Sequence, residues 1–197
     1  MKKLHLTGLA FVLSLTQVNL SFAGDIDPAT VPAAKQTISK NYLSAKEAAA
    51  MKDSMGAKAF MIDVRTAAEV EYVGGADSVD ANISYMVDDY TTWDDKKSRF
   101  MMSPNSGFLT KVSDAMKKVG LDKSAEVIVI CRSGDRSARA ADLLSNAGYT
   151  KVYSVVDGFE GDMGKEGEAK GRRAVNGWKN AGLPWSYNMT KSKMYIE

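Results

Sequence analysis

One run of sequence decides the fold, and it reads Val127-Ile128-Val129-Ile130-Cys131-Arg132-Ser133-Gly134-Asp135-Arg136-Ser137. Its first part has the length of a strand and is apolar at successive positions. This is typical of a central strand in a parallel sheet that is covered on both faces. A six-residue loop follows, and Ser137 is expected to cap the next helix. Cys131 is therefore predicted at the carboxyl end of a strand, where open α/β sheets bind their ligands.

The rest of the chain alternates between strand and helix patterns. Further strands are predicted at 59–64 and 151–156, and helices at 45–52, 66–72, 108–119 and 137–147. Ser44 and Glu47 form the capping-box pattern that starts the first of these helices. The alternation predicts a single α/β domain with a mostly parallel central sheet.

The amino-terminal residues have the pattern of an export signal. Lys2 and Lys3 precede an apolar stretch at 9–15, and a small-residue pattern ends at Ala23. The stretch is too short and too polar for a bilayer span of ~20 apolar residues, so we expect residues 1–23 to be a cleavable signal peptide. The mature protein is then expected in the periplasm or outside the cell, without a stable membrane anchor. An uncleaved amino-terminal anchor is the alternative.

Composition excludes several classes of function. The chain carries 26 basic and 24 acidic side chains, and the surplus, Lys2 and Lys3, belongs to the leader. No basic surface therefore argues for nucleic acid. The single histidine, His5, also lies in the leader, which leaves no Cys-His or Ser-His pair and too few ligands for a zinc site. The lone cysteine, Cys131, has no partner for a disulfide or for thiol–disulfide exchange.

The loop at Cys131 has features that activate a thiol without a histidine. Backbone amides beneath a helix N-terminus converge on one point, which favours a thiolate and an anionic substrate, and two arginines add positive charge. The predicted substrate-binding residues are Arg132, Ser133, Gly134, Asp135, Arg136 and Ser137. On the alternative interpretation, Cys131 is only a small apolar residue that ends a strand. Arg139 is left open, as a substrate contact or a solvated charge.

Four separated motifs, in the right order, resemble those of the rhodanese family of single-domain sulfurtransferases. They are Met61-Ile62-Asp63-Val64-Arg65-Thr66-Ala67-Ala68-Glu69, the Cys131 loop, Asp157-Gly158-Phe159 and Gly177-Trp178-Lys179-Asn180-Ala181-Gly182-Leu183-Pro184. The resemblance spans about residues 42–185. It implies a three-layer α/β sandwich with helices on both sides of the sheet. The chain departs from the family at 74–83, where the family's Gly-His-Ile-Pro-Gly-Ala has no counterpart.

The resemblance also implies an activity, with Cys131 as the catalytic residue and no cofactor. The thiolate takes the outer sulfur of thiosulfate or a related small anionic donor, and a thiol, cyanide or a protein acceptor then removes it. Two alternatives are kept. A non-enzymatic sulfur carrier or protein-binding module has the same loop. A cysteine phosphatase or arsenate reductase has a similar loop with Cys-x5-Arg spacing, whereas Cys131 and Arg136 are spaced as Cys-x4-Arg.

Charge and glycine content place the remaining segments. We expect an extended lead-in at 24–41, the rhodanese-like domain at 42–187, surface insertions near 85–106 and 161–173, and a carboxyl-terminal tail at 188–197. Asp63 and Arg65 are expected to be structural, as an internal ion pair that holds the first strand against the active loop.

Overall fold

The computed structural model describes residues 24–196, and the predicted leader at 1–23 lies outside them. Five parallel strands form the central sheet in the order β1-β8-β7-β2-β4. Their bounds are β1 Tyr42–Leu43, β2 Ala59–Asp63, β4 Ala81–Asn82, β7 Glu126–Ile130 and β8 Lys151–Val155. The strands predicted from the long apolar runs are therefore β2, β7 and β8.

The described chain contains the α-helices α1 Ala45–Met55, α2 Ala67–Val73, α3 Phe108–Lys118 and α4 Asp135–Asn146. Each overlaps a helix predicted from the sequence. Both α1 and α2 begin with a complete capping box, because Ser44 and Thr66 each exchange bonds with the glutamate three residues on. The short 3-10 turns are η1 Pro28–Thr30, η2 Ala33–Lys35, η3 Gly56–Lys58, η4 Gly167–Ala169 and η5 Lys191–Lys193.

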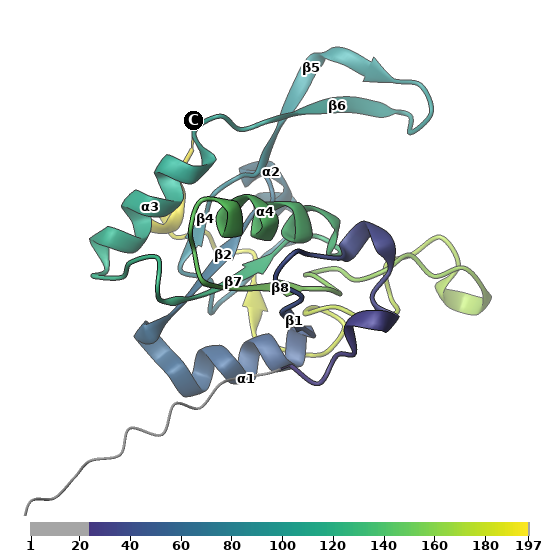
Figure 1. Ribbon diagram of the computed structural model, residues 1–197. Coiled ribbons are helices and arrows are strands. Elements are labelled where there is room, and N and C mark those ends of the chain that lie inside the picture. Colours follow the sequence, from purple (N-terminus) through teal and green to yellow (C-terminus); the bar gives the residue numbers. More distant parts are fainter. Residues whose placement is uncertain (1–23, 197) are drawn as a thin grey trace, which may run out of the picture.

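The central strand β7 contributes side chains to the core on both faces of the sheet. Val127 and Val129 pack in the cluster formed with α3 and α4, whereas Ile128 and Ile130 pack in the cluster formed with α1 and Trp178. These four side chains are fully buried, as expected for a strand that is covered on both faces. Figure 1 shows α1 on one side of the sheet and α3 and α4 on the other. The predicted three-layer α/β architecture is confirmed.

The segment at 24–41, which was expected to be an extended lead-in, packs on the domain. It contains η1 and η2, and it buries Val31 and Lys35. The amide of Ile38 donates to the Asp142 carboxylate of α4 at 2.7 Å. Because only isolated side chains of the segment are buried, no apolar periodicity reveals this packing in the sequence.

Two antiparallel pairs lie outside the central sheet. β3 Gly75–Ala76 pairs with β9 Trp185–Ser186, and β5 Met86–Asp94 pairs with β6 Arg99–Pro104. The β5–β6 hairpin occupies the first of the two expected insertions and extends away from the body of the protein (Figure 1). The second is an irregular excursion that contains η4. Among residues 24–196, no helix is long and apolar enough to cross a bilayer.

Candidate active site

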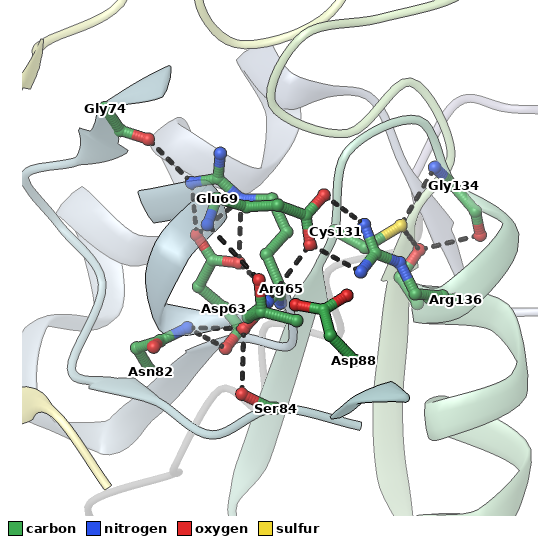
Figure 2. A network of polar contacts seen from close by, with 12 residues as sticks. Asp63, Arg65, Glu69, Gly74, Asn82, Ser84, Asp88, Cys131, Gly134 and Arg136 are labelled. Atoms are coloured by element: carbon green, nitrogen blue, oxygen red, sulfur yellow. Dashed lines mark hydrogen bonds and ion pairs between the residues drawn. The ribbon is translucent and has the colours of Figure 1, made fainter. Parts of the chain in front are cut away.

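Cys131 follows β7 directly, and only 1% of its surface is exposed. The amide of Gly134 donates to Cys131 Sγ at 3.2 Å, and the Cys131 thiol donates to Ser137 Oγ at 3.6 Å. Ser137 Oγ in turn donates to the Gly134 carbonyl at 2.8 Å. Figure 2 shows the Cys131 sulfur next to the Gly134 amide nitrogen. A backbone N–H aimed at the sulfur favours negative charge on it.

The start of α4 differs from the expectation. The helix begins at Asp135, with Gly134 in the N-cap position at φ 102, so the prediction that Ser137 is the N-cap is wrong. Only glycine fits here, because a Cβ at Gly134 would lie 2.2 Å from the Val156 carbonyl oxygen. This left-handed residue turns the chain into the helix early. Ser137 is consequently fully buried in the first turn, where its Oγ accepts from Ser154 Oγ at 3.1 Å.

The turn after β8 holds the backbone of the active loop. The Phe159 amide donates to the Cys131 carbonyl at 2.8 Å, and the Glu160 amide donates to the Arg132 carbonyl at 2.9 Å. Gly158 adopts φ 62, and a Cβ there would lie 2.6 Å from the Arg132 backbone. The Asp-Gly-Phe motif therefore fixes the loop by a close backbone approach that only glycine allows.

Arg136 does not bring a free positive charge into the site, because it is paired with Glu69. Its Nη1 and Nη2 donate to the two Glu69 carboxylate oxygens, each at 2.6 Å (Figure 2). Burial opposes the charge on Arg136, but the bonds and charge of Glu69 outweigh it and raise the Arg136 pKa. Burial also opposes ionisation of Glu69, and the Arg136 bonds outweigh it and lower the Glu69 pKa. One of the two predicted positive charges of the loop is thus compensated.

Glu69 is the site residue to which sequence analysis gave no role. Thr66-x-x-Glu69 is a visible capping-box pattern, and the Thr66 amide does donate to Glu69 Oε2 at 3.1 Å. The same carboxylate also binds Arg136, which lies 67 positions further along the chain. Nothing in the local pattern indicates this second partner.

Arg132 is the loop arginine that lacks such compensation. Its Nε is buried and has no hydrogen-bond partner within residues 24–196. Burial, followed by the positive charges of Arg173 and Arg136, lowers the Arg132 pKa. A bound anion would offset both the burial and the repulsion. The predicted residues Ser133 and Asp135 line the same cleft as Arg132, and so does Arg139, whose role the sequence left open.

The expected internal ion pair between Asp63 and Arg65 is confirmed. Arg65 Nη2 lies 2.6 Å from Asp63 Oδ2, and both side chains are buried. Arg65 also donates to the Gly74 carbonyl at 2.9 Å, and its guanidinium lies 4.2 Å from the Phe159 ring centroid. Because Phe159 binds the Cys131 carbonyl, the pair supports the active loop through this aromatic ring.

A cleft of about 740 Å³ opens above the loop. Its other walls come from α2 and the β5–β6 hairpin, through Tyr72, Val73, Met86, Tyr90, Phe100 and Met102. The volume lies in the range of sites that hold sizeable organic ligands, so it exceeds what a small inorganic donor needs. Within the part of the chain that the structure describes, no cluster of three or more His, Cys, Asp or Glu side chains is arranged to hold a metal ion.

Comparison with known proteins identifies the family. The sequence model of the rhodanese-like domain family matches residues 44–164 of this chain. The chain therefore belongs to the rhodanese-like family, a domain family that includes sulfurtransferases and non-catalytic members.

The chain is also similar to individual proteins and to a solved structure. An uncharacterized protein of Rickettsia conorii is 30% identical over 129 residues, which cover 66% of this chain and 84% of the relative. The thiosulfate sulfurtransferase GlpE of Tolumonas auensis is 44% identical over 41 residues, which cover 21% of this chain and 39% of that enzyme. The crystal structure of Rv0390 from M. tuberculosis is 29% identical with a TM-score of 0.57, and the match covers 75% of this chain and 97% of that one.

Proposed function

We propose that the protein is a sulfurtransferase that carries sulfur as a persulfide on Cys131. The observation that best supports this is the Gly134 amide, which donates to Cys131 Sγ at 3.2 Å within a short, tightly held loop. Together with the N-terminus of α4, this donor favours an anionic sulfur, whether thiolate or persulfide.

In the first half-reaction, the Cys131 thiolate attacks the outer sulfur of thiosulfate or a related donor. The S–S bond of thiosulfate breaks, sulfite leaves with the bonding electron pair, and the transferred sulfur stays on Cys131. We assign Arg132 to the sulfonate end of the donor, because its buried Nε has no partner in residues 24–196. Arg136, held by Glu69, positions the first turn of α4.

In the second half-reaction, an acceptor nucleophile attacks the terminal sulfur of the persulfide. The S–S bond to Cys131 breaks, and the electron pair returns to Cys131 as a thiolate. Cyanide leaves as thiocyanate, and a thiolate acceptor leaves as a persulfide. Electrons are conserved in each exchange, so the proposal requires no cofactor. The Gly134 amide stabilises the departing thiolate.

Intact mass spectrometry tests the proposal. The protein is treated with thiosulfate and then with cyanide, with Cys131→Ser as the control. We expect a gain of one sulfur atom that cyanide removes and that the control lacks. Steady-state thiocyanate production distinguishes an enzyme from a carrier that is loaded only once. Absence of sulfur loading, combined with hydrolysis of an aryl phosphate, would instead support the phosphatase alternative.

We also propose that export removes residues 1–23 and that the transfer takes place outside the cytoplasm. The support is the sequence pattern of the leader, with two lysines, a short apolar stretch and a small-residue motif that ends at Ala23.

A further inference from the structure

The β5–β6 hairpin presents an apolar strip that begins inside the cleft and continues beyond it. The apolar strip consists of Met86, Tyr90, Trp93, Phe100 and Met102. All but Trp93 line the cleft together with Cys131. Phe100 packs edge-on against both Tyr90 and Trp93, with ring centroids 5.4 and 5.2 Å apart. Trp93 is 51% exposed, so the apolar strip links the mouth of the active site to the outer part of the hairpin.

The length of the apolar strip indicates the size of what binds it. The pairing of β5 with β6 is irregular between Asp89 and Trp93, so Met86 lies opposite Pro104 and Trp93 opposite Phe100. These β6 partners are four strand positions, or roughly 13 Å, apart. A tripeptide thiol such as glutathione spans only about 10 Å when extended. An extended segment of about four to five residues matches the apolar strip.

The hairpin also offers hydrogen bonds to such a segment. In the described chain, β5 and β6 form a separate sheet of two strands, so each strand keeps one edge without a strand partner. Free edges of this kind accept an added strand through backbone bonds, while side chains at alternate positions give specificity. On β5, Met86 and Tyr90 lie on one face at even spacing, and both face the cleft.

The acidic and basic side chains that line the cleft are nearly equal in number, so they do not favour a highly charged partner. The basic side chains that line it are Lys97, Arg99, Arg132, Arg136 and Arg139. The acidic ones are Glu69, Asp88, Asp94 and Asp135. These opposite charges nearly balance, so recognition along the hairpin depends on apolar contacts and backbone bonds.

We propose that the β5–β6 hairpin binds an extended, apolar, cysteine-containing segment of a partner protein and delivers its thiol to Cys131. This inference rests on the proposed function, because the segment is the sulfur acceptor. The partner thiol loses its proton to water, and its thiolate attacks the terminal persulfide sulfur. The S–S bond to Cys131 breaks, Cys131 leaves as a thiolate, and the partner cysteine becomes a persulfide. Cys131 is nearly inaccessible, so an acceptor on a narrow extended segment reaches it better than one on a flat surface.

The test uses two peptides on the whole protein. The long peptide has a central cysteine with six residues of alternating valine and threonine on each side, and the short peptide keeps two on each side. Both have blocked ends. Transfer from sulfur-loaded protein to each peptide is followed by intact mass. Binding of the same peptides with serine in place of cysteine is measured by calorimetry, which requires no persulfide. Trp93→Ser is the test variant, and Val119→Ser, 58% exposed at the end of α3, is the matched control.

With the parent protein, we expect the long peptide to react and bind about tenfold better than the short one, as one well-placed aromatic anchor provides. Trp93→Ser should remove most of this advantage and leave the short peptide within about twofold, and Val119→Ser should change neither. Equal behaviour of long and short peptides would overturn the proposal, as would an equal loss for both in Trp93→Ser. Self-association abolished by Trp93→Ser would overturn it in favour of a second copy of the chain. If the serine peptides bind but thiosulfate transfers no sulfur to Cys131, the docking surface is supported and the proposed sulfur transfer is refuted.

Discussion

Replacement of Glu69 by glutamine tests the buried pair that links α2 to α4. Glutamine preserves the shape of the side chain and one acceptor oxygen. It places an amide NH2 against the second Arg136 N–H, so one of two charge-assisted bonds is lost and Arg136 keeps an uncompensated charge. The two side chains are only 22% and 15% exposed, so solvent screens the interaction little. We expect the free energy of unfolding to fall by about 2–4 kcal/mol.

Glu47→Gln is the matched control, because Glu47 caps α1 as Glu69 caps α2. Its carboxylate accepts from the amide and hydroxyl of Ser44 and from the amide of Asp25. Glutamine occupies this position of a capping box almost as well as glutamate. The cost of Glu47→Gln is therefore expected to be about 0.5–1 kcal/mol. The difference between the two variants isolates the bond to Arg136.

The effect of Glu69→Gln should depend on pH in a defined direction. Burial opposes ionisation of Glu69, but the Arg136 bonds outweigh it, so the folded pKa lies below the ordinary value of 4.5. The stability that ionised Glu69 contributes is complete above pH 4.5 and is lost as the pH falls through the lower folded value. The gap between the parent protein and Glu69→Gln should therefore be widest at neutral pH and narrow in acid.

Urea unfolding followed by the fluorescence of the three tryptophans measures these values. The parent protein and both variants are compared at neutral pH and at a series of acidic pH values. Equal losses for Glu69→Gln and Glu47→Gln at neutral pH would refute the role of the Arg136 pair. A gap that stays constant into acid would show that the charge of Glu69 is not its source.

Three further predictions concern the loop and the leader. Cys131→Ser should abolish sulfur loading in intact mass and change the free energy of unfolding by less than about 1 kcal/mol; retained loading would contradict the proposed nucleophile. Gly158→Ala should cost about 2–4 kcal/mol in urea unfolding, because its Cβ would lie 2.6 Å from the Arg132 backbone. Gly120→Ala, also at positive φ but with no atom within 4 Å, should cost only about 1 kcal/mol, and equal costs would count against the close approach. Amino-terminal sequencing of exported protein should begin near Gly24, and an intact leader would contradict the predicted cleavage.

Local patterns in the sequence are sufficient to predict the central strand of the fold. The apolar run before Cys131 forms β7, and its alternate side chains fill the two core clusters. This is predictable because apolar content and strand length are properties of a short segment. The start of α4 differs from the prediction because serine is a common N-cap, whereas here Gly134 takes that position through its left-handed backbone and its close approach to Val156.

The sequence by itself determined the strand, the loop and the position of Cys131, together with the lack of a second cysteine and of any histidine among residues 24–196. Only the tertiary structure decided which charges remain available in the site. Arg136 is compensated because the packing of α2 and α4 brings Glu69 to it across 67 positions, while the buried Nε of Arg132 keeps no partner in the described chain. In the same way, Lys35 of the lead-in meets Asp162 across 127 positions. Pairings at such separations depend on how whole elements pack, and no local period or propensity encodes them.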